Sequence, residues 1–496
     1  MNSNTLEIPT PASNRRRWLA LVVICFGQFM IVLDSTIVNV ALASIQRDLH
    51  FTQADLTWVV NAYLITFGSL LLLAGRAGDL IGRKKVFLAG VVLFTAASVL
   101  CGLAQDPATL IAARFLQGAG GALSSGVILA LIVTGFPKPG ERAQAMSVFT
   151  FVIAGGGSLG LLAGGVLTQL VSWHWIFFIN LPVGVATFWL GAVLIDETEG
   201  LGLRQGVDIA GSILVTAAMV LGVYSIVTAA QYGWASAHTL GFGAAAVGLL
   251  TSFVVLEGRI ANPIVPLRIL RIRSLVGASV ARAMLATGMF ATFFLGTLYL
   301  QQVRGYTAVE TGLAFLPWSL SLGVLSLGIT AKLMHRFGPR RVLVPGMLAI
   351  VTSLAVMANT GENASYFPML LGAYTLFGIG AGTSFMPLIT IAMSEVPAQD
   401  AGLASGIVNV TMQISAAIGL AALGTISTGH TATLAARGYS LSGALTGGYQ
   451  LSFGIAAACV SAGLLVVLVV LRPRGDRSPD ASVINREFVE GAAEAA

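Results

Sequence analysis

Two charged residues lie where the sequence is otherwise apolar, and their chemistry is the most informative in the chain. Asp34 belongs to the apolar stretch 18–42, and Arg114 belongs to the apolar stretch 109–133. A charge at bilayer depth costs at least ~2.5 kcal/mol, so such residues usually have a function. A neighbouring guanidinium favours the ionised form of a carboxyl group, whereas loss of water favours the protonated form. A movement that separates the two groups would therefore load or release a proton.

We expect these two residues to lie in one layer. Asp34 is ~12 Å from the end of its stretch, and Arg114 is ~8 Å into a stretch that runs the opposite way, at 1.5 Å per residue. A static ion pair that fixes helix packing and direct binding of a cationic substrate by Asp34 are the alternatives to proton binding. Asn39 is ~140° further round the same helix, and we expect it to bond a neighbouring helix.

The composition indicates that the helices carrying this pair span a membrane. The chain has 496 residues, of which 56% are hydrophobic and only 10% are Asp, Glu, Lys or Arg, with a mean hydropathy of +0.86. A soluble chain carries about 25% charged residues. The shortfall excludes an ordinary soluble enzyme, a disordered protein and a nucleic-acid binder with a basic surface. We predict an all-α integral membrane protein of the multi-pass kind, with the lipid bilayer as its solvent.

Long apolar runs interrupted by charges or turn residues predict about 14 spans. They lie near 18–42, 57–75, 86–104, 109–133, 143–170, 174–195, 209–230, 238–256, 275–300, 311–331, 341–359, 366–392, 402–427 and 448–471. Basic residues cluster on alternate loops, for example at Arg83, Lys84 and Arg340, whereas the opposite loops hold only Arg47, Arg304 and Arg437. This asymmetry predicts that both termini are cytoplasmic.

An internal repeat divides these spans into two halves. Thr52-x-x-Asp55 and Thr307-x-x-Glu310 precede corresponding spans, and Gly82-Arg83 corresponds to Gly338-Pro339 at nearly the same offset. Two parallel halves around a midplane cavity are typical of transporters. Both acids have capping-box spacing, which we favour over a role as vestibule charges for a cationic substrate. The predicted parts are a cytoplasmic tail (1–17), a first six-helix bundle (18–195), a linker with two extra helices (196–256), a second six-helix bundle (257–471) and a second cytoplasmic tail (472–496).

Two glycine-containing segments are candidates for moving parts. Gly156, Gly160 and Gly164 recur every four residues, followed by Gly165, and such a stripe permits either close helix packing or bending of the helix. A second segment is a short loop that combines glycines with one acid and several bases. It contains Gly75, Asp79, Gly82, Arg83 and Lys84. This loop either latches one conformation or only sets the topology.

Several motifs together resemble the major facilitator superfamily, and more closely its fourteen-helix drug:proton antiporter branch. The loop Gly75-x-x-x-Asp79-x-x-Gly82-Arg83-Lys84 matches the superfamily's cytoplasmic loop. Leu33-Asp34-Ser35-Thr36-Ile37-Val38-Asn39 matches the first-span motif of the branch, and Arg114-x-x-Gln117-Gly118 resembles its fourth-span motif. Trp173-His174-Trp175-Ile176-Phe177-Phe178-Ile179-Asn180 resembles its sixth-span signature. The glycine motif of span 5 departs from the family pattern, because Leu161 stands where proline is usual.

The resemblance implies the major facilitator fold and proton-coupled export of small amphipathic or hydrophobic, drug-like, sometimes cationic compounds across a bacterial cytoplasmic membrane. It assigns proton coupling to Asp34 and Arg114, and the latch to Asp79, Arg83 and Lys84. The alternative is dedicated export of one neutral or anionic metabolite, antibiotic or lipid.

The remaining predictions concern the cavity and the partners. Polar or aromatic residues that either line the cavity or only pack are Asn61, Tyr224, Trp318, Asn409 and Gln413. The five histidines lack ligand spacing, and no nucleotide-phosphate motif is present, so we expect no enzyme activity, no metal site and no cofactor other than the proton gradient. The expected partners are a small-molecule substrate and protons but no nucleic acid, and we expect a monomer.

Overall fold

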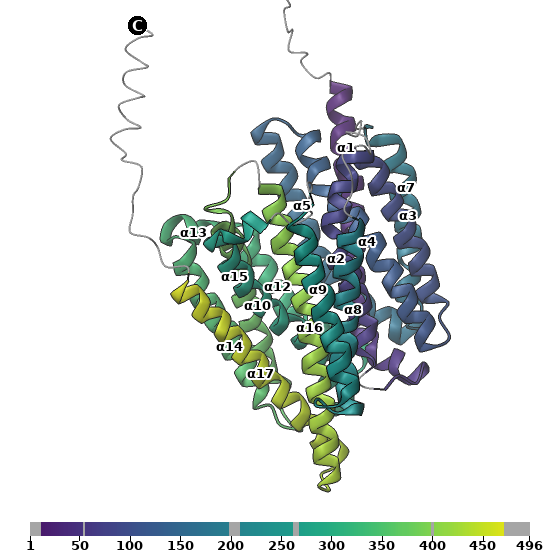
Figure 1. Cartoon of the computed structure of the whole chain (residues 1–496), viewed down its shortest axis with the longest axis vertical. Helices are drawn as coiled ribbons and strands as arrows, with labels where there is room; N and C mark the ends of the chain where they lie inside the picture. Colours follow the sequence, from purple (N-terminus) through teal and green to yellow (C-terminus); the bar gives the residue numbers. More distant parts are fainter. Residues whose placement is uncertain (1–10, 53–54, 198–208, 261–266, 398–400, 471–496) are drawn as a thin grey trace, which may run out of the picture.

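The computed structural model describes residues 11–52, 55–197, 209–260, 267–397 and 401–470, which form helices joined by short loops (Figure 1). The predicted tail 472–496 and residues 1–10 of the predicted tail 1–17 lie outside the described residues. The first bundle comprises α1 (Pro11–Asp48), α2 (Thr57–Ile81), α3 (Arg83–Gly102), α4 (Pro107–Gly135), α5 (Pro139–Leu170), α6 (Trp175–Phe178) and α7 (Asn180–Leu194).

Two further helices and a second bundle follow. The extra pair consists of α8 (Ile209–Tyr232) and α9 (Ala237–Glu257). The second bundle comprises η2 (Leu267–Arg271), α10 (Arg273–Leu298), η3 (Tyr299–Val303), α11 (Ala308–Ala314), α12 (Leu316–Val324), η4 (Leu325–Ile329), α13 (Thr330–Phe337), α14 (Pro339–Ala358), η5 (Tyr366–Leu370), α15 (Leu371–Met393), α16 (Ala401–Ala436) and α17 (Leu441–Val469). Figure 1 shows the first bundle on the right and the second on the left, with α8 and α9 in front of the seam between them.

The helices agree closely with the predicted spans. Among the described residues, 12 helices are long and apolar enough to cross a membrane. Two more predicted spans, 143–170 and 311–331, correspond to α5 and to the interrupted run from α11 to α13. The largest differences lie at α16, which extends beyond its predicted bound to Ala436, and at α1 and α17, which begin early, at Pro11 and Leu441. Ser440 explains the early start of α17, because its hydroxyl accepts a hydrogen bond from the amide of Gly443 and caps the helix.

The internal repeat is visible in local geometry. Gly82 and Gly338 are each the one-residue link between two helices, and each has a positive φ, of 106° and 83°, which favours glycine. Lys84 donates to the carbonyl of Ala192 at the end of α7, and Arg340 donates to the carbonyl of Leu468 at the end of α17, both at 2.8 Å. A cation at a helix C-terminus satisfies free carbonyl groups.

The capping box that the repeat predicts is present in the second half and only partly formed in the first. The Thr307 hydroxyl and the Glu310 carboxylate satisfy each other's backbone amides at the start of α11. The Thr52 hydroxyl accepts from the amide of Asp55 at 3.0 Å and donates to the Asp55 carboxylate at 2.7 Å, in the turn before α2. The cap interpretation is therefore confirmed for Glu310, whereas Asp55 belongs to a turn and α2 begins at Thr57 without a side-chain cap.

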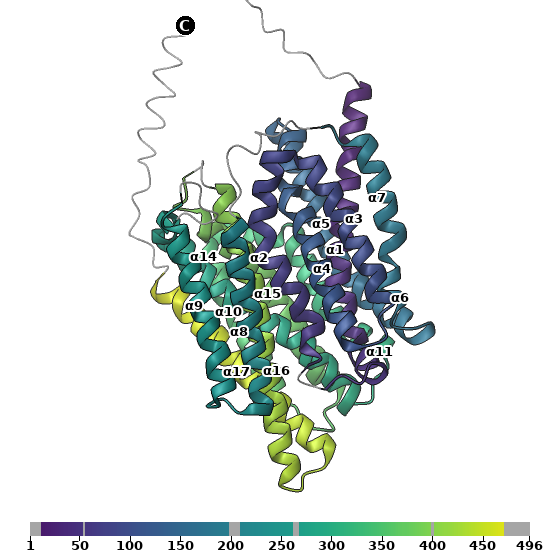
Figure 2. The ribbon, with the colours of Figure 1, turned by 45° about the vertical axis from the view of Figure 1, so that its right-hand side comes forward.

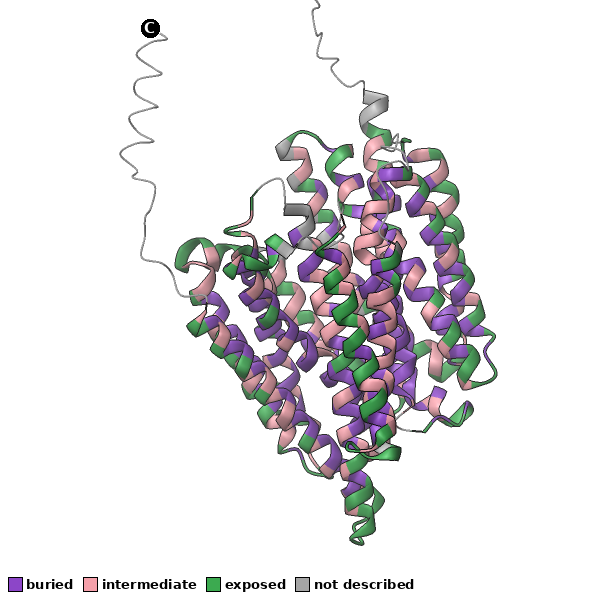
Figure 3. Ribbon diagram, in the orientation of Figure 1, coloured by how far each residue is buried: buried purple, intermediate pink, exposed green. Residues whose placement is uncertain are grey.

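The outward faces of the helices suit a hydrocarbon solvent. Figure 3 shows that exposed residues run along α9, and these include Leu240, Val247, Leu250, Val254 and Val255. A continuous exposed apolar surface of this kind indicates contact with lipid rather than water. The turned view in Figure 2 places α8 and α9 at the surface of the molecule. We call the side where α1 begins and α17 ends the terminal side, and the opposite side the far side.

Glycines allow the closest helix contact within the first bundle. A Cβ atom on Gly120 of α4 would lie 2.7 Å from the Cα atom of Phe94 on α3, and one on Gly90 of α3 would lie 2.8 Å from the carbonyl oxygen of Gly120. The second bundle repeats this contact, with Gly346 on α14 facing Gly380 on α15. The positions of α3 and α4, and hence of Arg114, depend on the absence of these side chains.

We predict that Gly120→Ala lowers stability by about 1–3 kcal/mol, because the added methyl group meets backbone that cannot rotate away. Thermal unfolding of the purified protein in detergent measures the effect. Gly135→Ala in the same helix is the matched control, since a Cβ atom there meets nothing within 4 Å. Equal melting temperatures for the two variants would contradict the close-contact account.

Candidate functional site

The two charges that the sequence places in one layer are bonded to each other. Nη1 of Arg114 on α4 lies 2.6 Å from Oδ2 of Asp34 on α1. The side chain of Asp34 is 0% exposed and that of Arg114 is 1% exposed. A buried carboxylate and a buried guanidinium at this distance form a charge-assisted hydrogen bond in surroundings without bulk water. Neither charge faces lipid.

Three neutral polar residues complete the network around Asp34. Oδ1 of Asp34 accepts a hydrogen bond from the Gln117 amide at 2.7 Å and another from the Asn180 amide at 3.1 Å. Both amides also donate to the hydroxyl oxygen of Ser98, at 2.6 Å and 3.1 Å. The network therefore ties together α1, α3, α4 and α7, and it leaves both oxygens of Asp34 occupied.

The guanidinium of Arg114 makes further hydrogen bonds and two aromatic contacts. Its Nε donates to the carbonyl of Val59 on α2 at 2.8 Å, and Nη1 also donates to Oε1 of Gln117 at 2.5 Å. The ring of Tyr63 lies 4.5 Å from the guanidinium carbon and that of Phe177 lies 5.9 Å from it, within the range of cation–π attraction. Gln117 thus bridges the pair, since its amide nitrogen meets the acid and its oxygen meets the base.

Gln117, Asn180 and Ser98 were not predicted as site residues from the sequence. The signal for Gln117 was its spacing, because a residue three positions after Arg114 shares its helix face. The signal for Asn180 was an amide in an otherwise apolar signature. Ser98 gave no signal, because serine is common in membrane helices and often bonds only its own backbone.

The prediction for Asn39 was wrong. Its amide donates to the carbonyl oxygens of Ser35 at 2.9 Å and Thr36 at 3.4 Å, both in α1 itself, and no bond from it to a neighbouring helix is present among the described residues. The residue is 3% exposed, so a bond to its own backbone satisfies an amide that would otherwise be buried without a partner.

The glycine stripe of α5 packs directly against the helix that carries Asp34. Gly156 faces Phe29 and Val32, a Cβ atom on Gly160 would lie 2.9 Å from the carbonyl oxygen of Leu33, and one on Gly164 would lie 2.8 Å from that of Ile37. Gly165 instead faces Ala308 of α11, in the other bundle. The helix runs unbroken from Pro139 to Leu170. These contacts favour the packing interpretation of the stripe over a kink.

The glycine-rich segment makes its contacts within the first bundle. The Asp79 carboxylate pairs with Arg83 at 2.9 Å, and the next base, Lys84, bonds α7. The prediction of a loop is wrong, because Gly75 and Asp79 lie in the last turns of α2 and Arg83 and Lys84 begin α3, with only Gly82 between the two helices. No ion pair from these residues to the second bundle is present in the part of the chain that the structure describes.

Hydrogen bonds between the two bundles lie on the far side. Gln301 donates to the carbonyl of Val40 and Gln302 donates to Gln46, both at 2.8 Å, which joins η3 to the end of α1. The amide of Val309 donates to Gln169 at 3.2 Å, which joins α11 to α5. The bundles are thus closed against each other on the far side. In the terminal half, Gly406 near the start of α16 packs against Leu72 of α2, so the bundles also touch there.

The far end of the sixth span is anchored to the first. Nε1 of Trp173 donates to the carboxylate of Asp48, at the end of α1, at 2.7 Å. Partial burial lowers the pKa of the adjacent His174, and the charge of Asp48 opposes this shift. The signature around Trp173 therefore fixes α6 and α7, and with them Asn180, relative to α1.

The five candidate cavity residues are not gathered at one place. Asn61 is 0% exposed and its amide has no partner among the described residues, whereas Gln413 lies beside Gly68 where α16 meets α2. Tyr224 packs against Phe242 within the extra pair. Trp318 belongs to an aromatic cluster of the second bundle, and Asn409 on α16 is half-buried.

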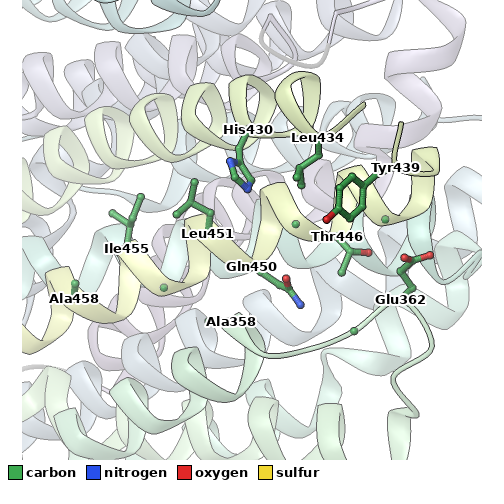
Figure 4. A pocket seen from close by; sticks show the side chains of 14 residues that line it. Ala358, Glu362, His430, Leu434, Tyr439, Thr446, Gln450, Leu451, Ile455 and Ala458 are labelled. Carbon is green, nitrogen blue, oxygen red and sulfur yellow. The ribbon is translucent and has the colours of Figure 1, made fainter. Parts of the chain in front are cut away.

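A pocket of about 750 Å³ lies elsewhere, at the far ends of α16 and α17 (Figure 4). Glu362, His430, Tyr439 and Gln450 line its polar end, and Leu451 and Ile455 line its apolar end. It contains none of the candidate cavity residues and lies within the second bundle, so we do not assign it to a path between the bundles.

We predict that Arg114→Leu destabilises the protein by about 3–5 kcal/mol, because it leaves Asp34 as an uncompensated buried charge. The double variant Asp34→Asn with Arg114→Leu removes both charges and should recover a large part of this loss. Thermal unfolding in detergent provides the measurement. If the double variant were no more stable than Arg114→Leu, the charge of Asp34 would not be the cause.

Comparison with known proteins identifies the family of the chain. Residues 24–420 match the family model described as Major Facilitator Superfamily. The chain is 37% identical to the puromycin resistance protein pur8 of Streptomyces alboniger, with 94% of each chain covered. It is 34% identical to the cephamycin export protein CmcT of Amycolatopsis lactamdurans (82% of this chain, 84% of the relative) and 36% identical to the multidrug resistance protein Stp of Mycobacterium tuberculosis (83% and 76%).

Solved structures show the same fold at low sequence identity. A peptide transporter POT superposes with a TM-score of 0.66 at 16% identity, covering 90% of this chain and 94% of the other. A bacterial homologue of the human lysosomal transporter Spinster, in an inward-facing conformation, gives a TM-score of 0.65 at 14% identity, covering 93% and 99%. The predicted resemblance is confirmed: this chain is a multi-pass membrane protein that belongs to the major facilitator superfamily.

Proposed function

We propose that this protein exports small amphipathic, drug-like molecules across the bacterial cytoplasmic membrane in exchange for protons, by alternating access. The observation that carries the proposal is the buried network of Asp34, Arg114 and Gln117. The relatives named for resistance to puromycin, for cephamycin export and for multidrug resistance support the class of substrate. Because the first two names each concern one antibiotic, a dedicated exporter of a single compound is the second candidate.

Gln117 gives the network a way to accept a proton. While Asp34 is ionised, its oxygens accept from Arg114, Gln117 and Asn180. A proton on the carboxylate turns one acceptor into a donor, and the Gln117 side chain can rotate its amide to present oxygen instead of nitrogen. Arg114 keeps the carbonyl of Val59 and the ring of Tyr63 as partners after the acid is neutralised. The pair can therefore separate without leaving the guanidinium unpartnered.

Access of water to Asp34 requires a movement of α1. The carboxylate is fully buried in the conformation described above, in which the bundles close on the far side. The side-chain-free stripe of α5 offers α1 a smooth surface along which it can shift. We place the terminal side in the cytoplasm, as the basic loops indicate, so the hydrogen bonds between the bundles lie on the outer side. Protons then enter Asp34 from outside, and they leave it on the cytoplasmic side as cargo binds.

The latch role of Asp79, Arg83 and Lys84 is part of the same proposal. Among the described residues, the bonds of Asp79, Arg83 and Lys84 stay within their own bundle. We infer that they contact the second bundle once the cytoplasmic side closes, so that their bonds are exchanged between the two states rather than lost. Such an exchange stabilises each state without favouring either one strongly.

We predict that Asp34→Asn abolishes substrate-driven proton movement, because the amide keeps the size of the carboxyl group but cannot titrate within the physiological pH range. Everted membrane vesicles with a pH-sensitive dye provide the measurement. Asp106→Asn is the matched control, since Asp106 is exposed and only caps α4 through Thr109, a role that Asn fills equally well. The hydrogen bonds from Thr109 lower the pKa of Asp106, so it stays ionised through the assay range. Normal proton movement in Asp34→Asn vesicles would remove Asp34 from coupling.

A further inference from the structure

A third deep charge lies in the second bundle and takes no part in the network of Asp34. Arg282 is nine residues into α10, which places it ~13 Å along the helix axis from Arg273. It is 7% exposed. The charged side chains that the structure describes as buried are Asp34, Arg114, Glu257 and Arg282, and Glu257 is the last residue of α9. Arg282 is therefore a deep cation outside the Asp34 network, and its partners must be identified.

The protein offers Arg282 only weak partners. Its Nε atom faces the thioether sulfur of Met412 on α16 at 3.4 Å, and its guanidinium carbon lies 5.5 Å from the centre of the Phe385 ring on α15. Nη1 has no hydrogen-bond partner, and no carboxylate lies within 4.0 Å, among the described residues. A thioether is a weak acceptor, and a buried cation without an anion is costly. A buried cation of this kind is usually functional, and a bound ligand can supply the missing anion.

A second unpartnered donor lies beside it. Ser279 is three residues before Arg282, so the two share one face of α10. Its hydroxyl is buried without a hydrogen-bond partner among the described residues, and the residue is 6% exposed. A guanidinium and a hydroxyl that both lack acceptors match an oxyanion, since the fork of arginine fits carboxylate geometry. The face around them is apolar and adaptable, with Met412 and Phe385.

The charges of the first bundle also favour a negatively charged cargo. Both oxygens of Asp34 are occupied by Arg114, Gln117 and Asn180, and the pair is neutral overall. A cationic cargo would have to compete with Arg114 for Asp34, whereas an anion meets an uncompensated cation at Arg282. The three helices around Arg282, α10, α15 and α16, include the one that contacts α2 of the first bundle.

We propose that Arg282, with Ser279, binds the oxyanion of an amphipathic cargo, above all an aromatic carboxylate, in the second bundle. The apolar side chains of Phe385 and Met412 then cover the apolar body of that cargo. This site rests on the proposed export function and specifies its substrate class as acids and zwitterions. The phosphate of an anionic lipid headgroup carries the same chemistry and is the other possible source of the oxyanion.

The test compares two probes that differ only in charge. Purified full-length protein in phosphatidylcholine nanodiscs is titrated with radiolabelled 1-naphthaleneacetate and with the neutral 1-naphthaleneacetamide. We expect the acid to bind about tenfold more tightly, the typical effect of one charge-assisted hydrogen bond. Arg282→Gln should reduce the affinity for the acid to that for the amide, and Arg282→Lys should keep part of the preference. Arg273→Gln is the matched control, because it removes a charge at the exposed start of the same helix.

Three results would overturn the proposal. The first is failure of the acid to bind, or equal affinities for acid and amide, in the unsubstituted protein, which needs no variant to fold. The second is a preference that persists in an Arg282→Gln protein that elutes as a single species. The third is loss of acid binding in phosphatidylglycerol nanodiscs, which would assign the site to lipid. Proton-driven export in vesicles is measured separately, so failure of the export proposal is distinguishable from failure of this site.

Discussion

The structure depends on one constraint, which is that a carboxylate and a guanidinium must be stabilised where no water is present. The ion pair alone would not be stable enough, because the free-energy cost of removing two charges from water can exceed the attraction between them. Asp34 and Arg114 are stabilised further by Gln117, Asn180, Ser98 and the carbonyl of Val59. The pair and its partners come from α1, α2, α3, α4 and α7, so the network determines how the first bundle is assembled.

The same requirement explains the use of glycine. Helices in lipid gain little from burying apolar surface against each other, and they associate through close packing and hydrogen bonds. Gly120 brings α4 against α3, and Gly160 and Gly164 bring α5 against α1. Both contacts border the helices that carry the charges. The glycines thus allow the backbone approach that the short side chains of Ser98 and Asp34 need in order to reach their partners.

Much of the fold was predictable from the sequence, because a bilayer leaves few alternatives to long apolar helices. The repeat could also be recognised in the sequence, since Gly82 and Gly338 need the same unusual backbone conformation. The site was only partly predictable. Helix periodicity placed Asp34 and Arg114 in one layer, but which neutral residues approach them depends on helix rotation and crossing, which periodicity does not encode. Asn39 shows the limit, because a buried amide on a helix can bond its own backbone as readily as a neighbour.

The two bundles have diverged in chemistry while keeping one architecture. In the first, the inner face of α4 carries Arg114, and Gly118 lies against the carbonyl of Tyr63. In the second, Gly378 lies against the carbonyl of Trp318 in the same way, but the surroundings are aromatic, with Phe315, Tyr374 and Phe377. This asymmetry favours proton binding in the first bundle and contact with apolar cargo in the second.

The central claim is that Asp34 changes its protonation state during the transport cycle. Infrared difference spectroscopy of the reconstituted protein between high and low pH tests it most directly, since a buried protonated carboxyl group has its own carbonyl stretching band. The account predicts a band that appears on acidification, disappears when a transported compound is added and is missing in Asp34→Asn. A spectrum without this band, or a band that Asp34→Asn retains, would show that Asp34 remains ionised and that the pair is only structural.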